Sequence, residues 1–252
     1  MPVTGDGADE ATGGSWRRRA WLTAAIVVMV LLGVGAYTGI SQARDRAYQA
    51  SLRPVGIPAT VSTALANYLQ LATVPGKAAP GFTLTDQNGQ TLSLSAFHGK
   101  AVVLEFMDPH CTDICPIISA EFVDAYHDLG AAAKNVVFLA VNVNPYHNKV
   151  TDMAAFSEEH GLTAIPSWHF FTGPVPTLKQ VWASYGVLVQ APSPTADVVH
   201  TSTVYFIAPD GREAFEAQPM DDHTTNGTAY LPSGQIAEWG QGIALIARHM
   251  LG

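Results

Sequence analysis

Two nearly uninterrupted apolar runs, separated by a helical pattern, limit the folds open to this 252-residue chain. Ala101–Met107 and Val136–Val143 are long enough for strands, and neither alternates with polar residues as a half-exposed strand does. Between them, apolar residues recur at helical spacing from Ile117 to Leu129. Strand, helix and strand in this order predict a β–α–β unit with parallel strands, and therefore an α/β fold.

Shorter patterns extend this core on both sides. Asn88-Gly89 lies between two short runs and is a strong hairpin signal, and Pro209-Asp210-Gly211 marks a second turn. The further elements that we expect are a hairpin of Pro80–Leu84 with Thr91–Leu94, a helix at Asp152–His160, a strand at Trp168–Phe171, a hairpin of Val198–Ala208 with Glu213–Glu216, and a final helix at Ile236–Leu251.

The N-terminal part of the chain predicts a membrane anchor. Residues 20–40 carry no charge, and a helix of that length measures ~31 Å, about the thickness of the hydrocarbon core. Arg17–Arg19 precede this run and favour a cytoplasmic N-terminus, which places the rest of the chain outside the cytoplasm. A cleaved signal peptide is the alternative, with Ser41-Gln42-Ala43 as a weak cleavage site.

The predicted organisation is therefore a cytoplasmic tail at residues 1–19, a transmembrane anchor at 20–40, a linker at 41–76 and a folded domain at 77–252. The formal net charge is −8, and six of the 13 basic residues precede residue 54. An acidic domain repels polyanions and weakly attracts cations, so nucleic acid is excluded as a partner.

The chain has two cysteines, Cys111 and Cys115, at the predicted start of the first helix, followed by Pro116. Three interpretations remain open for these cysteines: a structural disulfide, a redox-active catalytic pair, and a metal site. A disulfide that closes so short a loop adds little stability. Redox enzymes of the thioredoxin class separate their cysteines by two residues, whereas three separate them here.

The order of elements, with a cysteine motif between the first core strand and the first helix, resembles the thioredoxin-like fold, a central mixed sheet flanked by helices. Cys111-Thr112-Asp113-Ile114-Cys115-Pro116 resembles the Cys-x-x-x-Cys-Pro signature of the Sco/SenC family of copper-binding proteins. The segment from His200 to Gly211 resembles the second signature of that family. Together the two resemblances cover about residues 77–252.

The resemblance implies that Cys111, Cys115 and His200 bind a copper ion. Thiolates are soft ligands that select Cu(I), and imidazole also suits copper. The family resemblance further implies delivery of copper to an extracytoplasmic metalloprotein, typically the copper centre of a cytochrome oxidase. The cysteine pair must be reduced before it binds Cu(I), so a thiol reductant is an expected partner. The alternative is a thiol-disulfide oxidoreductase or a peroxiredoxin-like protein that uses Cys111 and Cys115.

Other candidate ligands are weaker. His110 precedes Cys111 and is either a ligand or a loop residue, and Met107 is either a thioether donor or part of the core. The cluster Met220-Asp221-Asp222-His223 is a weak second metal candidate in a polar loop.

Overall fold

The computed structural model describes residue 29 and residues 31–48, 52–74 and 76–252, in two compact units that divide between Leu52 and Arg53. In the first unit, residues 31–48 form a helix. The predicted tail 1–19 and the first part of the predicted anchor 20–40 lie outside the described residues. Within the described residues, no helix has both the length and the apolar character needed to cross a membrane.

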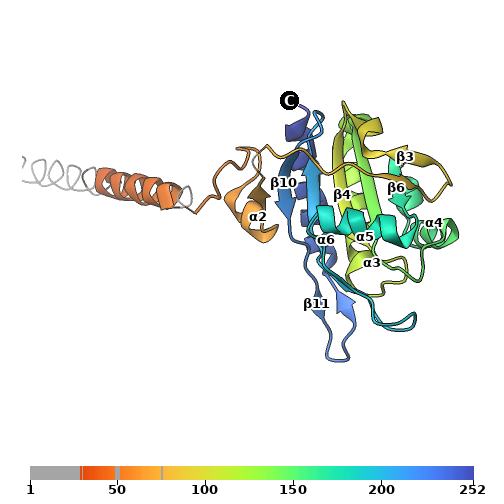
Figure 1. The fold of residues 1–252 in the computed structure, drawn as a ribbon. Coiled ribbons are helices and arrows are strands. Elements are labelled where there is room, and N and C mark those ends of the chain that lie inside the picture. Colours follow the sequence, from red (N-terminus) through yellow and green to blue (C-terminus); the bar gives the residue numbers. More distant parts are fainter. Residues whose placement is uncertain (1–28, 30, 49–51, 75) are drawn as a thin grey trace, which may run out of the picture. The chain divides into compact units, whose positions relative to one another are not determined.

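A six-stranded mixed sheet organises the second unit, in the order β1-β10-β9-β4-β5-β6 (Figure 1). On one side, β4, β5 and β6 run parallel; on the other, β9, β10 and β1 are each antiparallel to the preceding strand. The bounds of these strands are Ala72–Thr73 for β1, Ala101–Met107 for β4, Val136–Asn142 for β5, Trp168–Phe171 for β6, Val204–Ile207 for β9 and Glu213–Ala217 for β10.

The predicted β–α–β unit is confirmed. β4 and β5 pair in parallel from Ala101 opposite Val136 to Met107 opposite Asn142, and α3 (Ile114–Leu129) connects them. Every residue of both strands is buried, which explains why the two runs lack polar alternation.

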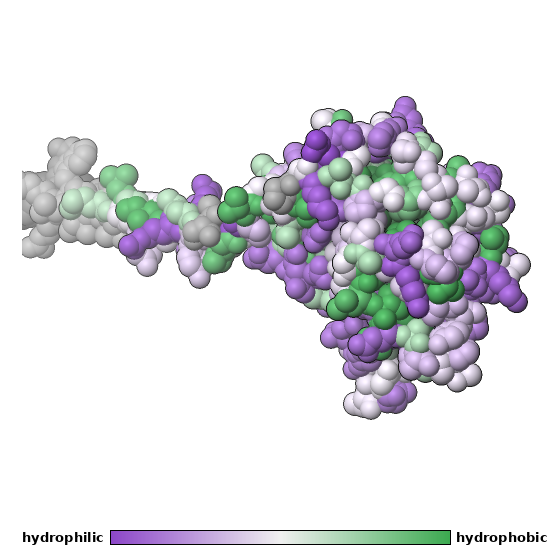
Figure 2. Space-filling view, in the orientation of Figure 1, coloured by the Kyte–Doolittle hydropathy of each residue, from purple (hydrophilic) through white to green (hydrophobic). Residues whose placement is uncertain are grey.

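Helices cover both faces of the sheet. One face packs against α3, α6 (Ser233–Met250), α2 (Thr63–Tyr68) and α4 (Val150–Glu159). The other face packs against α5 (Val175–Ser184) and the hairpin of β2 (Thr83–Thr85) and β3 (Thr91–Ser93). In Figure 1, α5 crosses the sheet on the side opposite α6. On the surface of this unit, hydrophobic residues lie in several separate patches among polar residues (Figure 2).

Residues 53–76, which belong to the predicted linker, are part of the second unit. Leu65 of α2 and Leu69, which directly follows this helix, are buried against α6, and β1 joins the edge of the sheet. Gly242 of α6 permits this packing, because a Cβ atom at that position would lie 2.5 Å from Leu69 Cδ1. The short helical pattern in this segment therefore contributes to the core of the domain.

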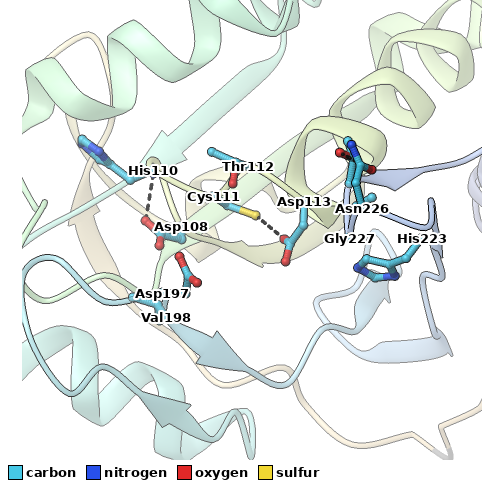
Figure 3. A pocket seen from close by; sticks show the side chains of 12 residues that line it. Asp108, His110, Cys111, Thr112, Asp113, Asp197, Val198, His223, Asn226 and Gly227 are labelled. Carbon is cyan, nitrogen blue, oxygen red and sulfur yellow. Dashed lines mark hydrogen bonds between the residues drawn. The ribbon is translucent and has the colours of Figure 1, made fainter.

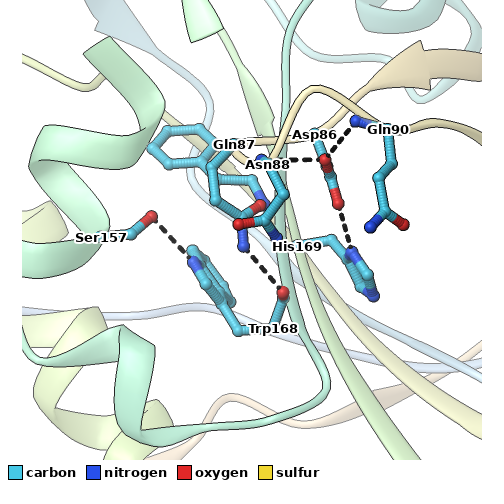
Figure 4. A network of polar contacts seen from close by, with 8 residues as sticks. Asp86, Gln87, Asn88, Gln90, Ser157, Trp168 and His169 are labelled. Atoms are coloured by element: carbon cyan, nitrogen blue, oxygen red, sulfur yellow. Dashed lines mark hydrogen bonds and ion pairs between the residues drawn. The ribbon is translucent and has the colours of Figure 1, made fainter. Parts of the chain in front are cut away.

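Side chains from the β2–β3 turn protect the edge strand β6 (Figure 4). Gln87 donates through Nε2 to the carbonyl of Trp168 and accepts through Oε1 from the N–H of Phe170, which imitates the pairing of another strand. Asp86 is fully buried; its Oδ1 accepts from the N–H groups of Asn88 and Gln90, and its Oδ2 lies 2.9 Å from His169 Nδ1. The predicted hairpin is thus confirmed, and its turn is hydrogen-bonded to the edge strand β6.

Two buried carboxyl groups lie under α3, on the same face of the sheet. Glu105 of β4 accepts two hydrogen bonds with Oε1, whereas neither oxygen of Glu121 in α3 has a partner among the described residues. Burial, with smaller electrostatic contributions from Glu105 and Asp124, raises the pKa of Glu121 well above its usual value of 4.5. Glu121 therefore keeps its proton in the folded chain at pH values where the unfolded chain has released it.

This retained proton predicts a pH-dependent stability. Since the folded state binds one proton more than the unfolded state above pH ~4.5, the free energy of unfolding falls as pH rises towards the raised pKa of Glu121. Replacing Glu121 by Met removes this pH-dependent contribution and also the cost of burying the unpartnered oxygens. We therefore expect the free energy of unfolding to rise by about 1–3 kcal/mol at pH 7.5, and to fall less between pH 5 and pH 8 than in the wild type. Denaturant unfolding at the three pH values measures both effects.

The matched control is Glu238→Met, an exposed glutamate of α6. It should leave the difference between pH 5 and pH 8 as in the wild type. Equal pH dependence in the wild type and Glu121→Met would refute the retained proton.

Candidate metal centre

The loop between β4 and α3 is held by a buried carboxylate. Asp108 Oδ1 accepts from the N–H of His110 and from Asn144 Nδ2, each at 2.9 Å. Asn144 follows β5, and its Oδ1 in turn accepts from the N–H groups of Tyr146 and His147. The loops that follow two neighbouring parallel strands are therefore tied to each other at the carboxyl end of the sheet.

The two cysteines lie at the start of α3 and contact each other. Cys111 is half-buried, Cys115 is fully buried in the first turn, and both thiols are free. The backbone N–H of Cys115 donates to Cys111 Sγ at 3.3 Å. This N–H group belongs to the first turn of the helix and has no acceptor within the helix. Cys111 Sγ donates to Oδ1 of Asp113 at 2.9 Å, and Asp113 also caps the helix by accepting from the N–H of Ile114.

The surroundings give the two thiols different reactivity. A hydrogen bond with Cys111 and complete burial raise the pKa of Cys115 well above its usual range. Partial burial of Asp113 acts to raise its pKa, but hydrogen bonds from the Cys111 thiol and the N–H of Ile114 lower it below its usual value. A negative charge thus lies beside the more accessible sulfur, and the raised pKa keeps the proton on the buried Cys115 thiol.

His200 ends β8 (Val199–His200), which pairs with β7 (Val189–Gln190). Its Nδ1 lies 3.0 Å from the carbonyl oxygen of Thr201; because that oxygen only accepts, Nδ1 carries the proton and the lone pair is on Nε2. Burial lowers the pKa of His200 despite the nearby charges of Asp108 and Asp113, so the ring is neutral at pH 7. A neutral imidazole with a free Nε2 is the form that binds metals.

The sheet explains why the segment of His200 lies at the same edge as the cysteine loop. β9 is antiparallel to β4, so the residues that enter β9 lie beside the end of β4, from which the cysteine loop departs. The predicted continuous strand Val198–Ala208 is interrupted at residues 201–203, between β8 and β9, and this break lets the chain turn at the site.

The structure brings together two of the three predicted ligands. Cys111 and Cys115 are in contact, whereas no set of three or more His, Cys, Asp or Glu side chains within the described part of the chain is arranged to hold a metal ion. The donor set nevertheless fits a soft metal: two sulfurs and one neutral imidazole with its proton already on Nδ1. Completing a three-ligand site requires His200 to move towards the sulfurs.

A pocket of about 460 Å³ opens over Cys111 (Figure 3). Three aspartates line it, Asp108, Asp113 and Asp197, and among the described residues no lysine or arginine does so. The far wall is the hairpin of β11 (Asp222–His223) and β12 (Ala229–Tyr230), which projects away from the sheet in Figure 1. The acidic lining makes the pocket attractive to a cation.

Two further histidines, His110 and His223, line this pocket. The rings of His110 and His147 contact each other at an angle of 30°, with centroids 3.7 Å apart, a contact that their separate loops do not reveal in the sequence. His223 lines the pocket, and its Nε2 lies 3.5 Å from Oδ2 of Asp221; within the described part of the chain no third ligand joins them to form a metal cluster. Met107 is fully buried in the core. Polar residues after two buried parallel strands, such as Asp108 and Asn144, are the signal by which the loop contact could have been expected.

A mixed sheet flanked by helices, with a dithiol at the start of the first core helix, defines a thioredoxin-like protein. The family model SCO1/SenC matches residues 72–227, more than half of the chain, and the protein therefore belongs to this family.

The chain is similar to known proteins in sequence and in fold. The chain is 28% identical over 148 residues to the SCO1 protein homolog of Bacillus subtilis, which covers 56% of this chain and 76% of that protein. It is 45% identical over 62 residues to the chloroplastic peroxiredoxin Q of Populus jackii, but this match covers only 25% of this chain and 29% of the relative. The structure of Bradyrhizobium japonicum ScoI with copper bound is similar in fold, with a TM-score of 0.53 at 22% identity, over 69% of this chain and 99% of that one.

The unequal thiols predict selective alkylation. With the full reduced chain at pH 7, we expect iodoacetamide to modify Cys111 at least ~10-fold faster than Cys115, because Cys115 is buried and its pKa is raised. Peptide mapping by mass spectrometry after short reaction times measures both rates. Cys115→Ser should keep the fast site and Cys111→Ser should lose it; faster labelling of Cys115 would contradict the assignment.

Proposed function

We propose that this protein is a copper chaperone, which binds copper through Cys111, Cys115 and His200 and passes it to a metalloprotein. The observation that carries the proposal is the pair of free thiols at the start of α3, with a neutral His200 whose Nε2 is free at the adjoining strand entry. Family membership and the copper bound by a relative of the same fold support it.

The donor chemistry favours Cu(I). Two thiolates and one imidazole make a soft three-coordinate set. Binding requires both thiols to release their protons, and the raised pKa of Cys115 makes this step depend on the metal, whose charge replaces that of the proton. His200 needs no deprotonation, since its ring is already neutral.

The setting of the site suits transfer rather than storage. Cys111 faces an open pocket and Cys115 is buried beneath it, so a receiving protein has access to one sulfur first. The three aspartates draw a cation to the pocket without lying in the ligand set. A site that must close by movement of His200 can also reopen when a partner offers competing ligands.

The cellular setting forms part of the proposal. The uncharged run 20–40 after Arg17–Arg19 anchors the chain in the cell membrane as a single pass, with the copper-binding domain outside the cytoplasm. The copper receiver is a metalloprotein such as the copper centre of cytochrome c oxidase. In an oxidising compartment a thiol reductant must keep Cys111 and Cys115 reduced.

Removing His200 tests the ligand set. We expect His200→Ala to lower Cu(I) affinity by more than the 10- to 100-fold typical of outer-shell changes, because a direct ligand is lost. Competition with a Cu(I) chelator on the full reduced chain measures this. His223→Ala, from the opposite wall of the same pocket, is the matched control and should change affinity less than ~10-fold.

The same variants separate copper delivery from dithiol chemistry. If the protein were a thiol-disulfide oxidoreductase, Cys111→Ser would abolish function while His200→Ala would leave it nearly unchanged. Cu(I) affinity of wild-type strength in His200→Ala would refute the proposed ligand, and with it the main argument for copper.

The anchor has its own test. Full-length protein should stay in the membrane pellet after carbonate washing, and a reporter fused after Gly252 should be active only outside the cytoplasm. A soluble mature product that begins near residue 44 would instead establish the signal peptide.

A further inference from the structure

Glu105 is the one ionisable residue of the buried strand β4, and its side chain is fully buried. The antiparallel pairing of β4 with β9 ends at Leu104 opposite Tyr205, one residue before Glu105. The chain that leads from His200 into β9 therefore diverges from β4 at this point, and no backbone pairing with β4 holds it there.

The side chain of Glu105 replaces this pairing. Its Oε1 accepts from Ser202 Oγ at 3.0 Å and from the N–H of Thr203 at 3.2 Å. Thr203 is buried, and its hydroxyl also contacts the side-chain amide of Gln218 at 3.2 Å. The segment directly after His200 is thus fixed to the strand that leads to the cysteine loop.

Glu105 acts as a neutral acceptor. Burial raises its pKa to about 8, despite the hydrogen bonds from Ser202 and Thr203, so the carboxyl group is protonated near pH 7. Its Oε2 is buried and has no partner among the described residues, which leaves Oε2 to carry the proton and Oε1 to accept. A glutamine side chain presents the same acceptor in the same shape.

We propose that Glu105 is a positioning residue of the metal centre, which through Ser202 and Thr203 fixes the segment after His200 at the edge of the sheet where the cysteine loop begins; this inference rests on the proposed copper function. Without Glu105, the buried N–H of Thr203 loses its partner, and the segment must rearrange to satisfy it. His200 then occupies a wider range of positions in the metal-free chain. Copper binding must first order the segment, and this cost lowers the Cu(I) affinity.

Three variants of the full reduced chain test this role. Glu105→Ala removes the acceptor, Glu105→Gln retains it, and Ser202→Ala removes one donor and keeps the core intact. Glu213→Ala is the matched control, because Glu213 is a buried glutamate of the same sheet, opposite Ile207 and away from the entry to β9.

Two measurements are made on each variant. Amide hydrogen exchange of Thr203 in the metal-free chain reports the tether directly, and chelator competition gives Cu(I) affinity. In Glu105→Ala we expect loss of Thr203 protection and a 10- to 100-fold loss of Cu(I) affinity, with Cys111 alkylated as in the wild type. Glu105→Gln should restore both, Ser202→Ala should lower affinity by about threefold, and Glu213→Ala should change neither.

The outcomes distinguish the two proposals. Wild-type Cu(I) affinity in both Glu105→Ala and Ser202→Ala would overturn the positioning role while leaving the ligand set intact. Glu105→Gln as impaired as Glu105→Ala would overturn the neutral acceptor. A wild-type chain that retains no Cu(I) would refute the copper function itself, and Thr203 exchange would still show whether Glu105 holds the segment. If Glu105→Ala fails to fold, Ser202→Ala tests the positioning role and Glu105→Gln tests the neutral acceptor.

Discussion

The parallel pairing of β4 with β5 is the interaction on which the rest of the structure depends. It brings the carboxyl ends of both strands to one edge of the sheet, where Asp108 and Asn144 join the two following loops. The same strand β4 pairs on its other side with β9, antiparallel, so the entry to β9 arrives at that edge too. The loop that holds Cys111, the loop that follows β5 and the segment that follows His200 meet at this edge because of the directions of the three strands.

Buried carboxyl groups lie close to this meeting point, and they differ in what they contribute. Glu105 makes two hydrogen bonds to the segment after His200, so the cost of its burial is offset by contacts at the proposed site. Glu121 has no partner among the described residues and lies against the same core.

Much of the fold is predictable from local patterns. β4 and β6 begin and end as predicted, and β5 and the final helix α6 differ from prediction by one to three residues, because long apolar periodicity is a strong signal. α5 (Val175–Ser184) is absent from the prediction: its short sequence follows Gly173-Pro174, and its apolar residues Leu178, Val181 and Trp182 show their common face only against the sheet. The two-residue strands β7, β8, β11 and β12 are too short to leave a pattern.

The sequence by itself determined that Cys111 and Cys115 lie close together, since only three residues separate them and Cys111 lies shortly before the helix that holds Cys115. It also determined the class of fold, through two buried runs around one helix. Only the tertiary structure decided which thiol is buried, how His110 meets His147, and that Glu105 holds the chain beside His200. The last two contacts join residues 37 and 98 positions apart, and their geometry depends on strand direction and register, which local spacing does not encode.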